Sequence, residues 1–196
     1  MVLFLLQFAT MLALGQLAHQ SKPLGIPEQP RVTVRNLYSE VVARHPVGIP
    51  KGADMKALAP YLSKSLLHRI DLARACEDDY YRGHKGSTNK PDIEWLEFGL
   101  FTGAMEQAGP RAYYIEGTQP EKDGSFRVNV RLKWGSRSEP WVWRVAAIMV
   151  QENGHFFIDD VVFLKEKESD VESRLSEILT AGCNGPHWIG YGKIAR

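Results

Sequence analysis

The sequence predicts an α+β protein in which helices pack on a curved antiparallel sheet of about four strands, followed by a C-terminal helix. Two observations support this fold class. Apolar residues recur at helical spacing in the first half of the chain, and from residue 111 onward they alternate with polar residues. Helices that precede a run of strands are typical of the α+β class, in which the sheet lays its apolar face against the helices. A length of 196 residues, 44% of them hydrophobic, suits one domain with a substantial core.

Residues 1–20 predict a signal peptide. They contain no Asp, Glu, Lys or Arg, and residues 2–14 form an apolar run that is short for a membrane span. Small residues follow, so cleavage is expected after Gly15 or near Ala18. The basic residue that normally precedes such a run is missing, which leaves an uncleaved anchor or a structural helix as alternatives. We expect an exported protein, periplasmic or secreted, with no membrane contact beyond this signal.

Residues 21–31 are rich in proline and predict a linker, so the domain itself is expected to span residues 32–196. An amphipathic helix follows, with Thr33 as its N-terminal cap and an end before Pro46. Residues 60–83 predict a second helix with one apolar stripe: Leu62, Leu66, Ile70, Ala73 and Cys76. Asp78 and Asp79 lie near the end of this helix, where its dipole disfavours acidic groups, which hints at a basic or polar partner.

Residues 92–109 predict either a short helix or a compact loop that covers the core. Four segments with strand periodicity follow, beginning near residues 111, 125, 141 and 155. The second segment alternates cleanly between apolar and polar residues, so one of its faces is expected to be wet. The third is apolar on both faces except for Arg144, so it is expected to be central and covered on both sides. A last helix is predicted from Ser169 to Gly182.

The pair Asn153-Gly154 is a strong hairpin signal and sets the register of the last two strands. A two-residue loop places Glu152 opposite His155, Ile148 opposite Asp159 and Ala147 opposite Asp160, whereas a three-residue loop shifts this pairing by one. Adjacent residues of a strand point to opposite faces, so one aspartate of the pair must face apolar neighbours.

The closing hairpin resembles that of the nuclear-transport-factor-two-like superfamily of cone-shaped α+β proteins. The resemblance rests on the last strand, which reads glycine, aromatic, isoleucine, two acids and valine: Gly154, Phe156, Ile158, Asp159, Asp160 and Val161. The helix that contains "NLYSEVV" is also similar to the first helix of that superfamily. The resemblance covers about Val32 to Lys165 and is closest in character to exported bacterial domains of unknown function. It implies a cone-like fold but no single activity, because the superfamily includes dehydratases, isomerases, cyclases, transport factors and pocket-bearing proteins.

Asp160 is the candidate catalytic residue, because in the resembling pattern it aligns with Phe156, Ile158 and Val162 toward the interior of the cone. A carboxylate in such a place would have a raised pKa unless donors satisfy it, which suits a general acid or base. The alternative is a structural aspartate that accepts hydrogen bonds from loop or helix amides, or pairs with an Arg or Tyr. Asp159 is then expected to lie at the rim or on the helix side.

The candidate ligand-binding residues are Tyr38, Trp143, Arg131 and Arg144. Aromatic side chains could line a pocket for an apolar ligand, although such residues more often belong to the core. The two arginines are the expected partners of an acidic group, internal or foreign. No histidine pair has metal-ligand spacing, and no cofactor motif is present, so we expect neither a metal nor a cofactor.

The two cysteines, Cys76 and Cys183, can form a disulfide if the chain is exported. Two buried free thiols that never meet are the alternative. The formal net charge of +1 gives no reason to expect nucleic acid as a partner.

Three functional hypotheses follow from these observations. The first is an exported, non-catalytic domain that binds a small ligand or a protein through the concave face of its sheet. The second is a lyase or isomerase that uses Asp160 as its acid or base. The third is a homodimeric interaction module that pairs through the open sheet face.

Overall fold

A computed structural model of the chain describes residues 28–85, 97–104, 109–136, 138–164 and 172–190. The predicted signal peptide and most of the predicted linker lie outside these ranges. The helices are α1 (Glu28–Arg44), α2 (Gly52–Leu58), the 3-10 helix η1 (Ala59–Tyr61), α3 (Lys64–Gly83) and α4 (Leu175–Ile178). The strands are β1 (Ala112–Pro120), β2 (Phe126–Gly135), β3 (Pro140–Glu152), β4 (His155–Phe163), β5 (Ser173–Arg174), β6 (Cys183–Asn184) and β7 (His187–Trp188).

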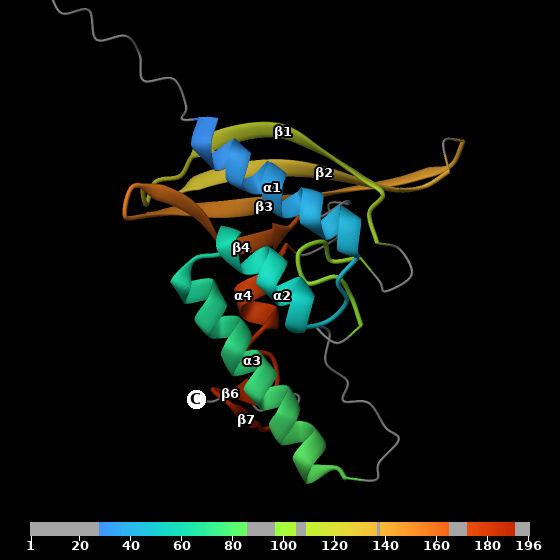
Figure 1. Cartoon of the computed structure of the whole chain (residues 1–196), viewed down its shortest axis with the longest axis vertical. Coiled ribbons are helices and arrows are strands. Elements are labelled where there is room, and N and C mark those ends of the chain that lie inside the picture. The colour runs from blue at the N-terminus through green and yellow to red at the C-terminus, as the bar shows by residue number, and fades with distance from the viewer. Residues whose placement is uncertain (1–27, 86–96, 105–108, 137, 165–171, 191–196) are drawn as a thin grey trace, which may run out of the picture.

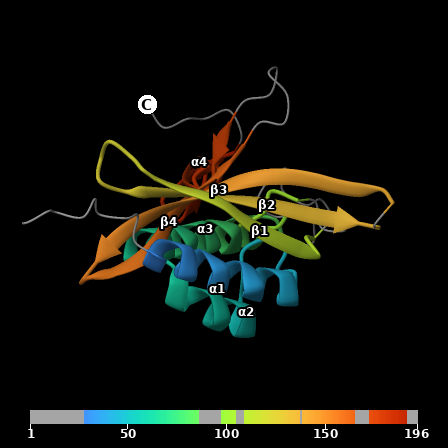
Figure 2. The same cartoon turned by 90° about the horizontal axis from the view of Figure 1, so that it is seen from above.

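The predicted α+β class is confirmed. Strands β1 to β5 form one antiparallel sheet in chain order, and β6 and β7 form a separate hairpin. The five-stranded sheet does not close on itself. Figure 1 shows α1 lying across the strands, and Figure 2, seen from above, shows α1 and α2 on one side of this sheet and α4 on the other. We call the side that α1 covers the helix face and the opposite side the outer face.

Helix α1 begins at Glu28, five residues before the predicted cap Thr33, so residues 28–31 are helical and not linker. Pro30 does not prevent this start, because an amide in the first helical turn has no intrahelical acceptor to lose. The Thr33 hydroxyl instead donates to the carbonyl oxygen of Phe156 at 3.1 Å, which fixes α1 against β4.

The second predicted helix is divided. Pro60 belongs to η1, and α3 begins at Lys64 with Ser63 as its cap, whose side chain accepts the N–H of Leu66 at 2.9 Å. The predicted apolar stripe is confirmed, since all of its members are buried: Leu62, Leu66, Ile70, Ala73 and Cys76. Helix α2 was not predicted, because its seven residues are too few for a periodic signal.

The core lies between the helix face and α1, α3 and the loop 97–104. On β2 and β3 the helix face carries seven buried residues: Val128, Val130, Leu132, Trp143, Val145, Ala147 and Met149. Residues 92–109 were predicted to be either a short helix or a compact loop. Of these, residues 97–104 form a compact loop that buries Leu100 and Phe101.

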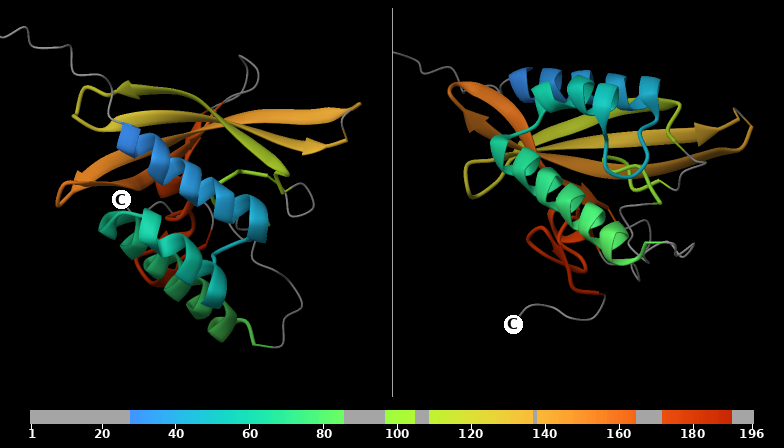
Figure 3. Two further views of the ribbon diagram at one scale, coloured as in Figure 1. Left: turned by 45° about the horizontal axis from the view of Figure 1, so that its top comes forward. Right: turned by 60° about the horizontal axis from the view of Figure 1, so that its bottom comes forward.

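The C-terminal segment differs from the prediction of one helix from Ser169 to Gly182. Residues 165–171 lie outside the described ranges, and beyond them only Leu175–Ile178 is α-helical. The helix is short because β5 pairs with β4 before it and a turn at Gly182, with φ of 72°, follows it. Figure 3 shows the segment running on beside α3, where β6 and β7 lie.

Candidate functional site

A β-bulge separates the two aspartates of β4. The hairpin register agrees with the two-residue loop from Glu152 opposite His155 as far as Met149 opposite Ile158. The register then shifts by one, so Ile148 pairs with Asp160, and Asp159 is the extra residue. Asp160 therefore lies on the outer face, whereas Ile158 stays on the helix face. The prediction that Asp160 shares the face of Ile158 is wrong, because it assumed an uninterrupted strand.

Asp159 joins β4 to the start of α3. Its carboxylate accepts the hydroxyl of Ser63, the residue that caps α3, and lies 3.7 Å from Arg69 Nη2. Arg69 Nη1 also donates to the carbonyl oxygen of Asp159 at 3.1 Å, and Ser63 N–H donates to the carbonyl oxygen of Ile158 at 2.9 Å. Asp159 is thus the predicted helix-side carboxylate, and it holds the N-terminus of α3 against the edge of β4.

Asp160 joins β4 to the start of α4. Its Oδ1 accepts the backbone N–H groups of Val161 at 2.9 Å and of Ser176 at 3.0 Å. Its Oδ2 accepts the hydroxyl of Ser176 at 2.7 Å, and Arg174 Nη1 lies 3.5 Å away. The residue is buried, with 5% of its surface exposed. Both carboxylate oxygens therefore accept hydrogen bonds from the helix or the strand, and an arginine lies beside them. These contacts fit the alternative in which Asp160 is a structural aspartate.

Tyr38 and Trp143 both hold the loop 97–104 to the core. The Tyr38 hydroxyl donates to the carbonyl oxygen of Phe101 at 2.9 Å, and the Trp143 indole N–H donates to that of Thr102 at 2.7 Å. Both side chains are buried. Tyr38 and Trp143 were predicted to line a ligand pocket. In the described part of the chain, they pack in the core on the helix face and anchor this loop.

Burial raises the pKa of the Tyr38 phenol far above its ordinary value near 10. The folded state therefore keeps this proton where the unfolded state releases it. The resulting stability is fully present below pH 10 and declines as the pH rises beyond it. We expect Tyr38→Phe to flatten the fall in unfolding free energy between pH 9 and 11, measured by urea denaturation. Tyr114→Phe, at an exposed position, is the matched control, and an unchanged slope in Tyr38→Phe would contradict this assignment.

Arg131 and Arg144 lie side by side on the outer face and share one carboxylate. They are paired residues of β2 and β3, and Glu116 contacts both, at 2.8 Å from Arg131 Nε and 2.9 Å from Arg144 Nε. Glu116 occupies a bulge in β1, between Ile115 and Gly117. The ring of Tyr114 lies 4.6 Å from the Arg131 guanidinium carbon. The prediction that these arginines meet an acidic group is confirmed, and the group is internal.

The four predicted ligand-binding residues are thus divided between the two faces of the sheet. Tyr38 and Trp143 lie on the helix face, and Arg131 and Arg144 lie on the outer face. One pocket cannot contain all four.

A disulfide and an aspartate fasten the C-terminal hairpin to α3. Cys76 and Cys183 are bonded, which confirms the predicted pair. One turn further along α3, the Asp79 carboxylate accepts the N–H of Trp188 at 3.0 Å and pairs with Arg82 at 2.9 Å. His187 Nδ1 lies 3.8 Å from the same carboxylate. The polar partner inferred from the position of Asp79 near the helix end is therefore present.

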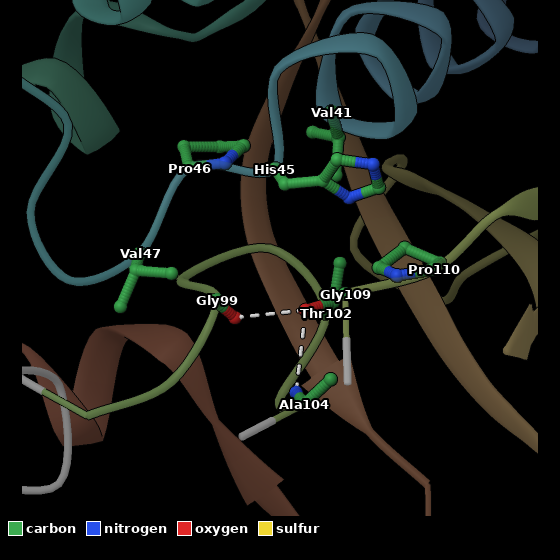
Figure 4. Close-up of a pocket in the computed structure, with 9 residues that line it drawn as sticks. All are labelled: Val41, His45, Pro46, Val47, Gly99, Thr102, Ala104, Gly109 and Pro110. Carbon is green, nitrogen blue, oxygen red and sulfur yellow. Dashed lines mark hydrogen bonds between the residues drawn. The ribbon is translucent and has the colours of Figure 1, made fainter. Parts of the chain in front are cut away.

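Four hollows of the described surface are each either small or open to solvent. Figure 4 shows one where the end of α1 meets the loop 97–104, lined in part by His45, Thr102 and Gly109. Its volume of about 10 Å³ is room for a single water. Larger hollows of about 310 to 520 Å³ are open to solvent and lie beside α2, between α1 and β4, and at the end of α3. None of these four hollows is lined by Asp160.

No metal-ligand cluster is found among the described residues. The five histidines in that part of the chain are all exposed: His45, His68, His84, His155 and His187. In the same ranges, no helix combines the length and hydropathy that a membrane span requires.

Sequence reasoning missed Glu116, Ser63, Arg69 and Ser176. Ser and Glu are common in loops and strands, and their partners lie far away in sequence, so no local signal distinguished them. Comparisons with protein-family models, with curated proteins and with solved structures found no match.

Proposed function

We propose that the protein is an exported, non-catalytic domain that binds a protein partner through the outer face of β1 to β3. The observation that supports this is the exposed group of Tyr114, Glu116, Arg131 and Arg144. Tyr114 is 47% exposed, and the two arginine side chains are 40% and 54% exposed. Arginine and tyrosine are enriched at protein interfaces. None of the four hollows described above is lined by these residues, which favours a protein over the small ligand that the sequence also allowed, because small molecules bind in concave sites.

The geometry of Asp160 favours binding over catalysis. An acid or base must reach the substrate in a site where a reacting atom fits. Asp160 is buried, and its carboxylate oxygens accept hydrogen bonds from Ser176 and Val161. The lyase or isomerase alternative therefore receives no support from the described residues.

Export is supported by the disulfide between Cys76 and Cys183, because such bonds persist in oxidising compartments. We expect the full chain, expressed in a bacterial host, to accumulate in the exported fraction. Its mass is expected to be that of a chain cleaved after Gly15 or near Ala18. A full-length chain that stays in the cytoplasm with reduced cysteines would refute export. Mass spectrometry of the fractionated protein gives both readouts.

Membership of the nuclear-transport-factor-two-like superfamily is part of the same proposal. A first helix packed on an antiparallel sheet and a closing hairpin that carries two aspartates support it. A cone-like curvature of the sheet belongs to this proposal as well.

A homodimer is the alternative occupant of the outer face. The sequence favours a homodimer because β3 is apolar on both faces except for Arg144, so a second copy could cover its outer face. Ala146, an apolar outer-face residue of β3, is buried within the chain itself, which weakens that argument. Light scattering separates the cases, since a heterologous binding domain is expected to have the mass of a monomer.

The proposal is tested with a photo-crosslinking amino acid at position 114 in the exporting host. Position 81 on α3 is the matched control, because Tyr81 and Tyr114 are each 47% exposed. We expect one defined adduct at position 114 that disappears in Arg131→Gln/Arg144→Gln, and no such adduct at position 81. An adduct that is equal at both positions, or absent at position 114 in correctly exported protein, would reject the outer face as a binding site.

A further inference from the structure

The outer face of β2 and β3 concentrates positive charge. On this face β2 carries Arg127, Arg131 and Lys133, and β3 carries Arg144, which is paired with Arg131. The carboxylate of Glu116 on β1 lies beside Arg131 and Arg144. The whole chain has a formal net charge of only +1. The excess is therefore local, and charge complementarity selects partners at this face.

We propose that the partner of this face is an acidic protein segment whose Asp or Glu side chains bind Arg131 and Arg144. This inference rests on the proposed function, because it specifies the chemistry of the partner at the same face. Three features of the face lead to it.

The first feature is that the two guanidiniums are held in place before any partner arrives. Glu116 contacts the Nε atom of each, and the Tyr114 ring packs against Arg131. Ordering a long side chain costs entropy on binding, so positions that are already fixed lose less. Each guanidinium has five N–H donors, and the contacts to Glu116 involve the Nε of each. Both side chains remain substantially exposed.

The second feature is the spacing. Arg131 and Arg144 are directly paired across β2 and β3, and neighbouring strands lie about 4.8 Å apart. The carboxylate of Glu116 bridges the pair by giving one oxygen to each arginine. A second carboxylate from a partner can accept from the remaining Nη N–H donors of the pair, since guanidinium and carboxylate form parallel hydrogen bonds.

The third feature is the shape and composition of the face. None of the four hollows described above lies on it, whereas small anions are held in concave sites. Single-stranded nucleic acid is bound by successive aromatic platforms. Here Tyr114 alone of the residues placed at this face is aromatic. An acidic peptide needs neither an enclosed site nor a row of platforms.

The test measures binding of a fluorescein-labelled octaglutamate peptide to the oxidised, mature protein by fluorescence anisotropy at 20 mM and 150 mM salt. Arg131→Gln/Arg144→Gln is expected to weaken binding about tenfold. The matched control is Arg31→Gln/Arg35→Gln on α1, which removes the same charge from another exposed ion-pair cluster. It is expected to change affinity by less than about twofold. Arg131→Lys/Arg144→Lys keeps the charge but removes the fork, and is expected to weaken binding several-fold.

Three results would overturn the inference: no peptide binding by the unaltered protein, equal weakening in the face and control variants, or tighter binding of an eight-residue oligothymidylate than of octaglutamate. The crosslinking experiment reads the proposed function separately. An adduct at position 114 together with no octaglutamate binding would keep the face as a binding site and reject its acidic partner.

Discussion

Asp160→Ala is expected to lower the free energy of unfolding by about 3 kcal/mol, because it removes the acceptor that joins β4 to α4. The backbone N–H and hydroxyl of Ser176 and the N–H of Val161 all donate to this carboxylate. Alanine leaves these donors without their acceptor in a buried place, and it leaves Arg174 without its nearest anion. Urea denaturation at pH 7, followed by circular dichroism, measures the loss.

Two further variants test the cause of this effect. Asp160→Asn keeps one acceptor oxygen, so its destabilisation is expected to be roughly half as large. Asp71→Asn removes an exposed carboxylate that pairs with Arg74 on α3, and is expected to change stability by less than about 0.5 kcal/mol. If Asp160→Ala were as stable as Asp71→Asn, the structural role of Asp160 would be rejected and an acid-base role would regain its place.

The Asp pair shows where prediction from the sequence succeeded and where it could not. The hairpin signal Asn153-Gly154 gave the correct register near the turn, because turn chemistry is local. The bulge at Asp159 depends on Ser63 and Arg69, which are about 90 residues away. No pattern inside β4 reports those partners, so alternation alone placed Asp160 on the wrong face.

The helices and their ends follow the same rule. The apolar stripe of α3 was predictable, because burial imposes a regular spacing on a 20-residue helix. Helix α4 has only four residues, and β5 and the turn at Gly182 decide where it begins and ends. Its residues Leu175 and Ile178 are buried at helical spacing, since apolar periodicity reports burial even where it misreports the length of a helix.

At the outer face, the sequence predicted that the arginines contact an acidic group, but it did not predict which residue supplies that group. Arg131 and Arg144 were expected to meet an acidic group, because two arginines on adjoining strands of a sheet need compensating charge. Glu116 could not be assigned to them, since its position depends on the bulge in β1. The position of Asp79 at an unfavourable helix end predicted a partner in the same way, and that partner came from a hairpin more than 100 residues later.

Breaking the disulfide is expected to have the largest effect on stability. Cys76 and Cys183 are 107 residues apart, so their bond restricts a long loop of the unfolded chain. In the loop-entropy account this is worth about 5 kcal/mol. Cys76→Ala, Cys183→Ala and the double variant remove the same bond, so all three are expected to lose about the same stability in urea denaturation.

A local effect accompanies the global one. The hairpin of β6 and β7 also contacts Asp79 and, through Trp188, Tyr80 of α3, but breaking the bond removes its covalent link to the helix. We expect limited proteolysis to cut the single variants within residues 172–190 before the sheet is attacked, and to spare this segment in the oxidised protein. The double variant is the decisive control. If it lost much more stability than either single variant, buried packing of the Cys76 and Cys183 side chains, and not the bond, would be the source of the effect.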